Sequence, residues 1–309
     1  MQVVPHFEVA LTPPDLRPWL AGDGDIPGFM TRDGAEPGPH LLLLSLMHGN
    51  EFAGAIVLDR LLRDGFRPTR GRVTLGFANI EAFATFDAAR PTQSRFIDED
   101  LNRVWAPEVL AAATASAERR RARQMLPLVL AADAVLDLHS MLWPSEPLVL
   151  AGTSARGRAL AQRMGGPGLI VADVGHATGK RLIDHPRFSG PGQAMAVLVE
   201  AGQHWHAETV TMMERSVRGL LAAMGMGPSV AAVPRARCAE VTEAVVAQTA
   251  GFSFVRPWRG GEVVAKGRTV LALDGEREVR TPYDECLLVM PSLRPAPGHT
   301  AVRLARFVS

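Results

Sequence analysis

Three residues of this chain have side chains that together can bind a divalent metal ion. His48 and Glu51 lie three positions apart, and this spacing on a helical turn or tight loop lets both side chains face one point. His139, within the segment DLHS, is the natural candidate for a third ligand from a distant part of the chain. Two histidines and one carboxylate leave a catalytic zinc ion an open position, where it can hold and acidify water. An HxxE pair alone arises often by chance, so the prediction of a zinc site depends on where these residues lie in the fold.

A second polar cluster lies at residues 95–103, with the sequence RFIDEDLNR. It contains Arg95, Asn102 and Arg103 within nine residues and shows little regular hydrophobic pattern. A guanidinium group can bind a carboxylate with two hydrogen bonds, and an asparagine can add a third. Taken alone, the segment is better interpreted as a solvated charged loop.

The apolar pattern around these residues predicts the elements that position them. Short apolar runs, typical of strands buried on both faces, occur at residues 40–47, 73–78, 134–138, 148–151, 169–174 and 194–199. Helical patterns follow the first run and occupy residues 107–131 and 207–225, and the ERRRAR run inside the former is expected to be a solvated helix face. This alternation indicates an α/β fold with a mainly parallel sheet. His48, His139 and Glu200 each come directly after an apolar run, so we expect them to converge at the carboxyl edge of the sheet.

The pattern changes near residue 227, after which short strand-like segments alternate with turns up to the end of the chain. We therefore predict a catalytic domain at residues 1–226 and an all-β module at residues 227–309 that covers the site. Strands of the module are expected at residues 240–247, 251–254, 263–266, 269–273 and 287–290.

Composition excludes several classes of partner. The 33 basic and 32 acidic residues leave a net charge of +1, so no global field favours nucleic acid or an anionic membrane. No stretch approaches the roughly 20 apolar residues that span a bilayer. Two cysteines in 309 residues suggest free thiols in a reducing compartment, so the cytoplasm is the expected location.

Four motifs occur in an order that resembles the succinylglutamate desuccinylase/aspartoacylase family, a branch of the zinc carboxypeptidase superfamily. They are HGNE at residues 48–51, RFIDEDLNR at 95–103, DLHS at 137–140 and VEAG at 199–202. The resemblance implies a zinc-carboxypeptidase-like domain with a mixed, mainly parallel sheet flanked by helices. The later β module fits the same layout and resembles a lipoyl-like sandwich.

The resemblance also implies a role for each matching residue. His48, Glu51 and His139 match the three ligands of one zinc ion per chain, and Asp100 matches the aspartate that orients a ligand histidine. The remaining matches concern the reaction: Glu200 would move the proton from water to the leaving amine, Arg95 would polarise the scissile carbonyl, and Asn102 and Arg103 would bind the substrate carboxylate. Tyr283 lies where the family's β module can supply a substrate-contacting tyrosine, and the alternative is that it packs at the edge of the module.

One departure concerns a further substrate arginine, which relatives place between residues 185 and 200. Arg187 is the candidate for that role here, which puts an acylaspartate or succinylglutamate substrate in doubt. His204 and His206, just after Glu200, are expected to be surface or hydrogen-bonded residues outside the site.

The sequence thus predicts a zinc-dependent deacylase that acts on a small N-acyl amino acid. A metallocarboxypeptidase acting on short peptides would use the same metal site, and a non-catalytic binding protein would keep the same fold. The acyl group, the amine and the assembly stay open, a homo-oligomer being one possibility.

Overall fold

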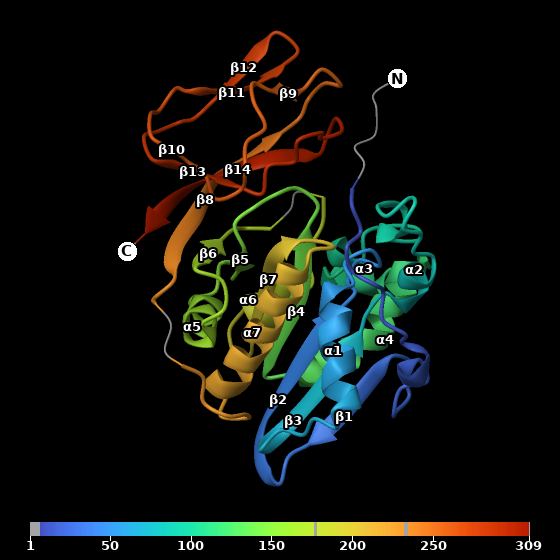
Figure 1. The fold of residues 1–309 in the computed structure, drawn as a ribbon. Helices are drawn as coiled ribbons and strands as arrows, with labels where there is room; N and C mark the ends of the chain where they lie inside the picture. Colours follow the sequence, from blue (N-terminus) through green and yellow to red (C-terminus); the bar gives the residue numbers. More distant parts are fainter. Residues whose placement is uncertain (1–6, 176–177, 232–233, 309) are drawn as a thin grey trace.

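The structure is a computed structural model that describes residues 7–175, 178–231 and 234–308. Its centre is an eleven-stranded mixed sheet with the order β1-β3-β2-β4-β7-β5-β6-β8-β14-β13-β10 (Figure 1). Strands of the first part of the chain are β1 (Phe29–Asp33), β2 (Glu36–Ser45), β3 (Arg70–Phe77), β4 (Ala134–Met141), β5 (Leu148–Leu150), β6 (Leu169–Ala172) and β7 (Met195–Gln203). The predicted α/β class is therefore confirmed.

Strands β3, β2, β4 and β7 run parallel to one another, whereas β1 is antiparallel to β3 and β5 is antiparallel to β7. The run LLLL at residues 41–44 explains why β2 is central, because successive side chains of a strand point to opposite faces. Leu41 and Leu43 belong to one core, and Leu42 and Leu44 belong to the other.

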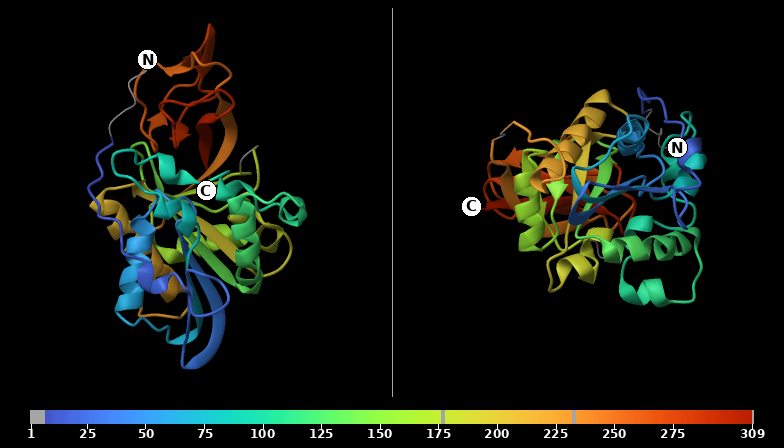
Figure 2. Two further views of the ribbon diagram at one scale, coloured as in Figure 1. Left: turned by 90° about the vertical axis from the view of Figure 1, so that its right-hand side faces the viewer. Right: turned by 90° about the horizontal axis from the view of Figure 1, so that it is seen from below.

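Helices cover both faces of this sheet (Figures 1 and 2). One core contains side chains from α1 (Ala53–Arg63), α5 (Ala155–Met164) and α7 (Ala207–Ala223). The opposite core contains side chains from α3 (Pro107–Ala111), α4 (Ala117–Ala131) and α6 (Pro186–Ser189). The short helix α2 (Ile80–Ala84) and four 3-10 turns, η1 (Arg17–Trp19), η2 (Gln93–Arg95), η3 (Leu101–Arg103) and η4 (Leu182–Asp184), lie in the connections.

The single helix predicted for residues 107–131 is wrong, because the structure has two helices there. Ala112 has an extended backbone that ends α3, and the Ser116 side chain caps α4 by accepting a hydrogen bond from the Arg119 N–H. The expectation of a solvated ERRRAR face is also wrong in part, since Glu118 and Arg121 are buried. Arg121 donates to the carbonyls of Phe77 and Ala78, which satisfies its buried guanidinium.

Beyond residue 236 the chain is all β in the described residues, as expected, and contains β8 (Arg237–Val246), β9 (Ser253–Phe254), β10 (Val263–Val264), β11 (Val270–Asp274), β12 (Arg277–Arg280), β13 (Cys286–Val289) and β14 (Thr300–Val308). A separate three-stranded sheet, β12-β11-β9, packs with β8, β13 and β14 around a small apolar core. Because β8 pairs in parallel with β6, the large sheet continues across the predicted boundary at residue 227. The division into two domains stays a prediction.

No helix of the described residues has the length and apolar character to cross a membrane.

Candidate active site

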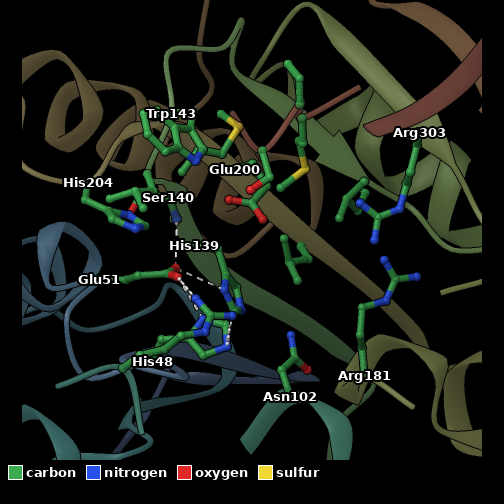
Figure 3. Close-up of a pocket in the computed structure, with 18 of the residues that line it drawn as sticks. His48, Glu51, Asn102, His139, Ser140, Trp143, Arg181, Glu200, His204 and Arg303 are labelled. Carbon is green, nitrogen blue, oxygen red and sulfur yellow. Dashed lines mark hydrogen bonds and ion pairs between the residues drawn. The ribbon is translucent and has the colours of Figure 1, made fainter. Parts of the chain in front are cut away.

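The three candidate metal ligands come together at the carboxyl edge of the central strands. His48 and Glu51 lie between β2 and α1, and His139 lies near the end of β4. One ligand atom from each lies within 4.8 Å of the others, and the residues are 4%, 2% and 2% exposed. Figure 3 shows the three side chains pointing toward one another.

Each histidine of the triad has one nitrogen toward Glu51 and the other toward an aspartate. His48 Nδ1 lies 2.8 Å from Oε1 of Glu51, and its Nε2 lies 2.9 Å from Oδ1 of Asp100. His139 Nδ1 lies 3.2 Å from Oε2 of Glu51, and its Nε2 lies 2.9 Å from Oδ2 of Asp137. Metal-binding histidines are usually oriented in this way by a carboxylate on the remote nitrogen. The donor set therefore fits a metal ion that prefers nitrogen and oxygen ligands, with Asp100 placed as predicted.

Ionisation of the triad agrees with this arrangement. Burial alone raises the pKa of Glu51, but the charge on His48 and the hydrogen bonds from both histidines outweigh it and hold that pKa well below its usual value. Burial alone lowers the pKa of His139, but Asp137 and Glu51 outweigh it and hold that pKa well above its usual value.

Arg95 lies against the triad. Its Nη1 donates to Oε1 of Glu51 at 3.1 Å, and its Nη2 donates to Oδ2 of Asp100 at 3.0 Å. The buried carboxylate of Glu118, on α4, accepts hydrogen bonds from the main-chain N–H groups of residues 97, 98 and 99 and so fixes the loop that carries Arg95 and Asp100. This role could not be predicted from the sequence, because Glu118 lies within a charged helical run.

Asn102 and Arg103 follow on η3 and line the same cavity as the triad. Oδ1 of Asn102 accepts a hydrogen bond from the N–H of Leu182, which leaves its amide nitrogen directed toward the cavity in Figure 3. Arg103 Nη1 donates to the carbonyl of Asn102 at 2.7 Å. Burial, reinforced by neighbouring arginines against the counter-effect of Asp100, lowers the pKa of Arg103 to about 10, so it stays charged at neutral pH.

Glu200 lies beside the triad on strand β7. It is paired in register with His139 of β4, so both side chains project from the same edge of the sheet. Its carboxyl is 6% exposed, and its Oε2 has no hydrogen-bond partner among the described residues. Burial and the nearby charge of Glu51 raise the pKa of Glu200 to about 8.

These side chains line one cavity of about 220 Å³. The segment beyond residue 227 contributes Met290, Pro291, Ser292 and Arg303 to its wall. Arg181 lines it too, although its guanidinium contacts Asp173 Oδ1 at 2.6 Å and Asp184 Oδ2 at 2.8 Å. Both arginines lie on the opposite side of the cavity from the triad in Figure 3.

Two predicted substrate contacts lie elsewhere. Tyr283 does not line the cavity; its hydroxyl lies 2.6 Å from Oγ1 of Thr242, and its ring stacks on Arg306. Arg187 does not line it either, because its guanidinium donates to the carbonyl of Ala132. The structure thus places Arg181 and Arg303, which the sequence did not single out, where Arg187 was expected.

His204 was expected outside the site, but it lines the cavity and is 3% exposed. Its Nδ1 lies 2.8 Å from Oγ of Ser140, which also lines the cavity. Burial lowers the pKa of His204 to about 4, so the ring is neutral at neutral pH.

Comparisons with known proteins agree with this description. Residues 37–149 match the family model of the succinylglutamate desuccinylase/aspartoacylase catalytic domain, which confirms the resemblance predicted from the motifs. No curated protein sequence matches the chain.

Solved structures with the same fold cover nearly the whole chain. A succinylglutamate desuccinylase from Vibrio parahaemolyticus superimposes with a TM-score of 0.70 at 17% identity, over 92% of this chain and 87% of that one. A succinylglutamate desuccinylase/aspartoacylase from Rhodobacter sphaeroides superimposes with a TM-score of 0.67 at 19% identity, over 94% of this chain and 92% of that one. The product-bound ectoine utilization protein EutE (DoeB) from Ruegeria pomeroyi superimposes with a TM-score of 0.65 at 19% identity, over 90% of this chain and 87% of that one.

Proposed function

We propose that this protein is a zinc-dependent hydrolase that removes an acyl group from the nitrogen of a small amino acid or a related carboxylate. The observation that carries the proposal is the convergence of His48, Glu51 and His139 with the buried carboxyl of Glu200 in one cavity. The match to the desuccinylase/aspartoacylase catalytic domain and the names of the similar structures support the same chemistry.

His48, Glu51 and His139 would hold the zinc ion, with Asp100 and Asp137 behind the histidines. Bound zinc supplies a Lewis acid and brings the pKa of water to about 7. Proton transfer, stabilisation of charge and substrate binding fall to side chains of the protein. Glu200 is the proton carrier, because it is buried beside the triad and its Oε2 has no hydrogen-bond partner among the described residues.

Arg95 contributes a charged donor beside the triad, where negative charge develops on the scissile carbonyl oxygen. Loss of one such donor typically costs on the order of 3 kcal/mol in the barrier. Arg103 and the amide nitrogen of Asn102 are proposed to bind the substrate carboxylate, because both line the cavity on another side of the triad.

The cavity volume bears on substrate size. Drug-sized ligands occupy pockets of roughly 300–1,000 Å³, whereas this cavity measures about 220 Å³. A single acylated amino acid is therefore favoured over a peptide. We propose that the segment beyond residue 227 sets this limit, since Met290 and Arg303 form part of the wall.

The experiment is a hydrolysis screen with metal-free protein, before and after addition of zinc. Substrates are acetyl-, succinyl- and formyl-amino acids, including acetylated diamino acids, with short peptides as the comparison. Zinc-dependent release of a free amine from at least one acyl amino acid is expected. Release of C-terminal residues from peptides would favour the carboxypeptidase alternative, and zinc binding without any turnover would favour a binding protein.

A further inference from the structure

The pairing between β4 and β7 changes register next to the triad. The two strands are in register at His139 and Glu200 but next pair at Met141 and Gln203, so β7 contains one extra residue in this interval. Gly202 makes the bulge possible, because it has a φ of +137° and a Cβ there would lie 2.8 Å from Oγ1 of Thr209. Bulges of this kind re-aim side chains beside active sites.

The bulge brings His204 across to the end of β4. Its main-chain N–H donates to the carbonyl of Met141 at 3.0 Å, and its Nδ1 lies 2.8 Å from Oγ of Ser140. His204 thus contacts two consecutive residues of β4, one through the main chain and one through the side chain, at the place where the ladder between the strands is interrupted.

The Ser140–His204 contact determines which group donates the hydrogen bond and which ring nitrogen of His204 carries the hydrogen. Both residues are buried, and a buried hydroxyl needs an acceptor for its hydrogen. Nδ1 of His204 is the side-chain partner that the described residues offer to Oγ of Ser140. The hydroxyl therefore donates to Nδ1, and the ring hydrogen of the neutral histidine is on Nε2.

Ser140 in turn contacts the metal ligand Glu51. Its main-chain N–H donates to Oε2 of Glu51 at 3.0 Å, while Oε1 is engaged by His48 and Arg95. Both carboxylate oxygens are thus held, which fixes the rotation of the carboxylate plane. Groups that orient metal ligands in this way typically contribute about 10- to 100-fold to metal affinity.

We propose that His204 is a positioning residue for Glu51, acting through Ser140. The imidazole holds the Ser140–Met141 segment where β4 leaves the ladder, and the Ser140 N–H stays aimed at Oε2 of Glu51. The inference rests on the proposed function, in which Glu51 is a zinc ligand.

The test measures the zinc dissociation constant by competition with a chelator, without substrate. His204→Asn keeps a polar atom near the position of Nδ1, whereas His204→Gln places one near Nε2 and loses the contact with Ser140. Ser140→Ala removes the same contact from the other side. His206→Ala is the control, because this histidine is two residues away and exposed. Circular dichroism verifies that each variant is folded.

His204→Gln and Ser140→Ala are expected to weaken zinc binding by about 10-fold. This is the lower end of the range for groups that orient metal ligands, because His204 acts on Glu51 through a second residue. His204→Asn and His206→Ala should stay close to wild type. Equal zinc affinity for all variants would overturn the inference. It would also be overturned if His204→Gln kept the wild-type zinc affinity and His204→Asn lost it, since Nε2 would then be the functional atom. If zinc affinities followed the expected order but no acyl amino acid were hydrolysed, the proposed function would fail and this inference would stand.

Discussion

Replacement of Glu200 by glutamine is expected to stabilise the metal-free protein near pH 8 and to remove most of the turnover of the zinc-loaded protein. The wild-type carboxyl is buried and its Oε2 lacks a hydrogen-bond partner among the described residues, so ionisation in the folded state is unfavourable. Burial and the charge of Glu51 raise its pKa from 4.5 to about 8. Glutamine has nearly the same shape but never ionises, so it avoids this cost.

The direction and magnitude of this change in folding stability follow from the linkage between proton binding and folding. Between pH 4.5 and about pH 8 the folded state keeps a proton on Glu200 that the unfolded chain has lost. The contribution of this group to stability is therefore fully present below pH 4.5 and is lost as pH rises to about 8. At about 1.4 kcal/mol for each pH unit, this interval corresponds to about 5 kcal/mol.

Urea unfolding of chelator-treated wild type and Glu200→Gln, at about pH 5 and about pH 8, measures this difference. The variant should gain stability relative to wild type between the two conditions, by up to about 4 kcal/mol over these three pH units. Glu276→Gln is the matched control because it removes an exposed carboxyl from the β11–β12 turn. If both variants behaved alike, Glu200 would ionise freely in the folded protein and the argument from burial would be refuted. With zinc restored, Glu200→Gln should bind metal and substrate but lose most of kcat, because the amide cannot accept a proton.

The remaining predictions concern metal and substrate. His139→Ala should lose most of the bound zinc in elemental analysis, since one of three ligands is removed; full retention would exclude His139 from the site. Arg103→Ala should raise KM by about 10- to 100-fold with little change in kcat, because a charge-assisted hydrogen bond contributes about 1.5–3 kcal/mol; equal hydrolysis of free-acid and amidated substrates would contradict a carboxylate contact. Tyr283→Phe should leave KM unchanged, because the Tyr283 hydroxyl contacts Thr242 and the residue does not line the cavity; a large rise in KM would place Tyr283 at the substrate after all.

Local pattern was sufficient to predict the central strands and the triad. Parallel strands buried on both faces consist of consecutive apolar residues, so β2, β4 and β7 could be located from the sequence. Side chains that follow such runs must meet at the carboxyl edge of the sheet. This geometric rule identified His48, His139 and Glu200 from the apolar runs alone, whereas the resemblance assigned their roles and those of Asp100 and Asn102.

Residues that depend on long-range pairing were not predicted. Arg303 reaches the cavity because β14 pairs with β8 and β8 with β6, and none of these pairings leaves a local signal. His204 reaches Ser140 through a bulge of one residue, and a shift of one residue in a strand turns every side chain to the other face. Tyr283 was misplaced for the same reason, because a position in a turn does not show which side of the sheet the turn covers.

Continuity of the sheet has a consequence for how the cavity is built. Arg303 Nε lies 3.6 Å from Oδ2 of Asp173, which follows β6, and the same carboxylate contacts Arg181. The side of the cavity opposite the triad is thus assembled from both parts of the chain and held by shared buried charges. Because Arg303 lies on β14, this wall is complete only when β8 and β14 have joined the sheet. The candidate metal ligands depend on strands β2 and β4, whereas the shape of the far wall depends on the pairing of β6, β8 and β14. Changes in the segment beyond residue 227 can therefore alter which substrate fits without moving the groups that carry out the reaction.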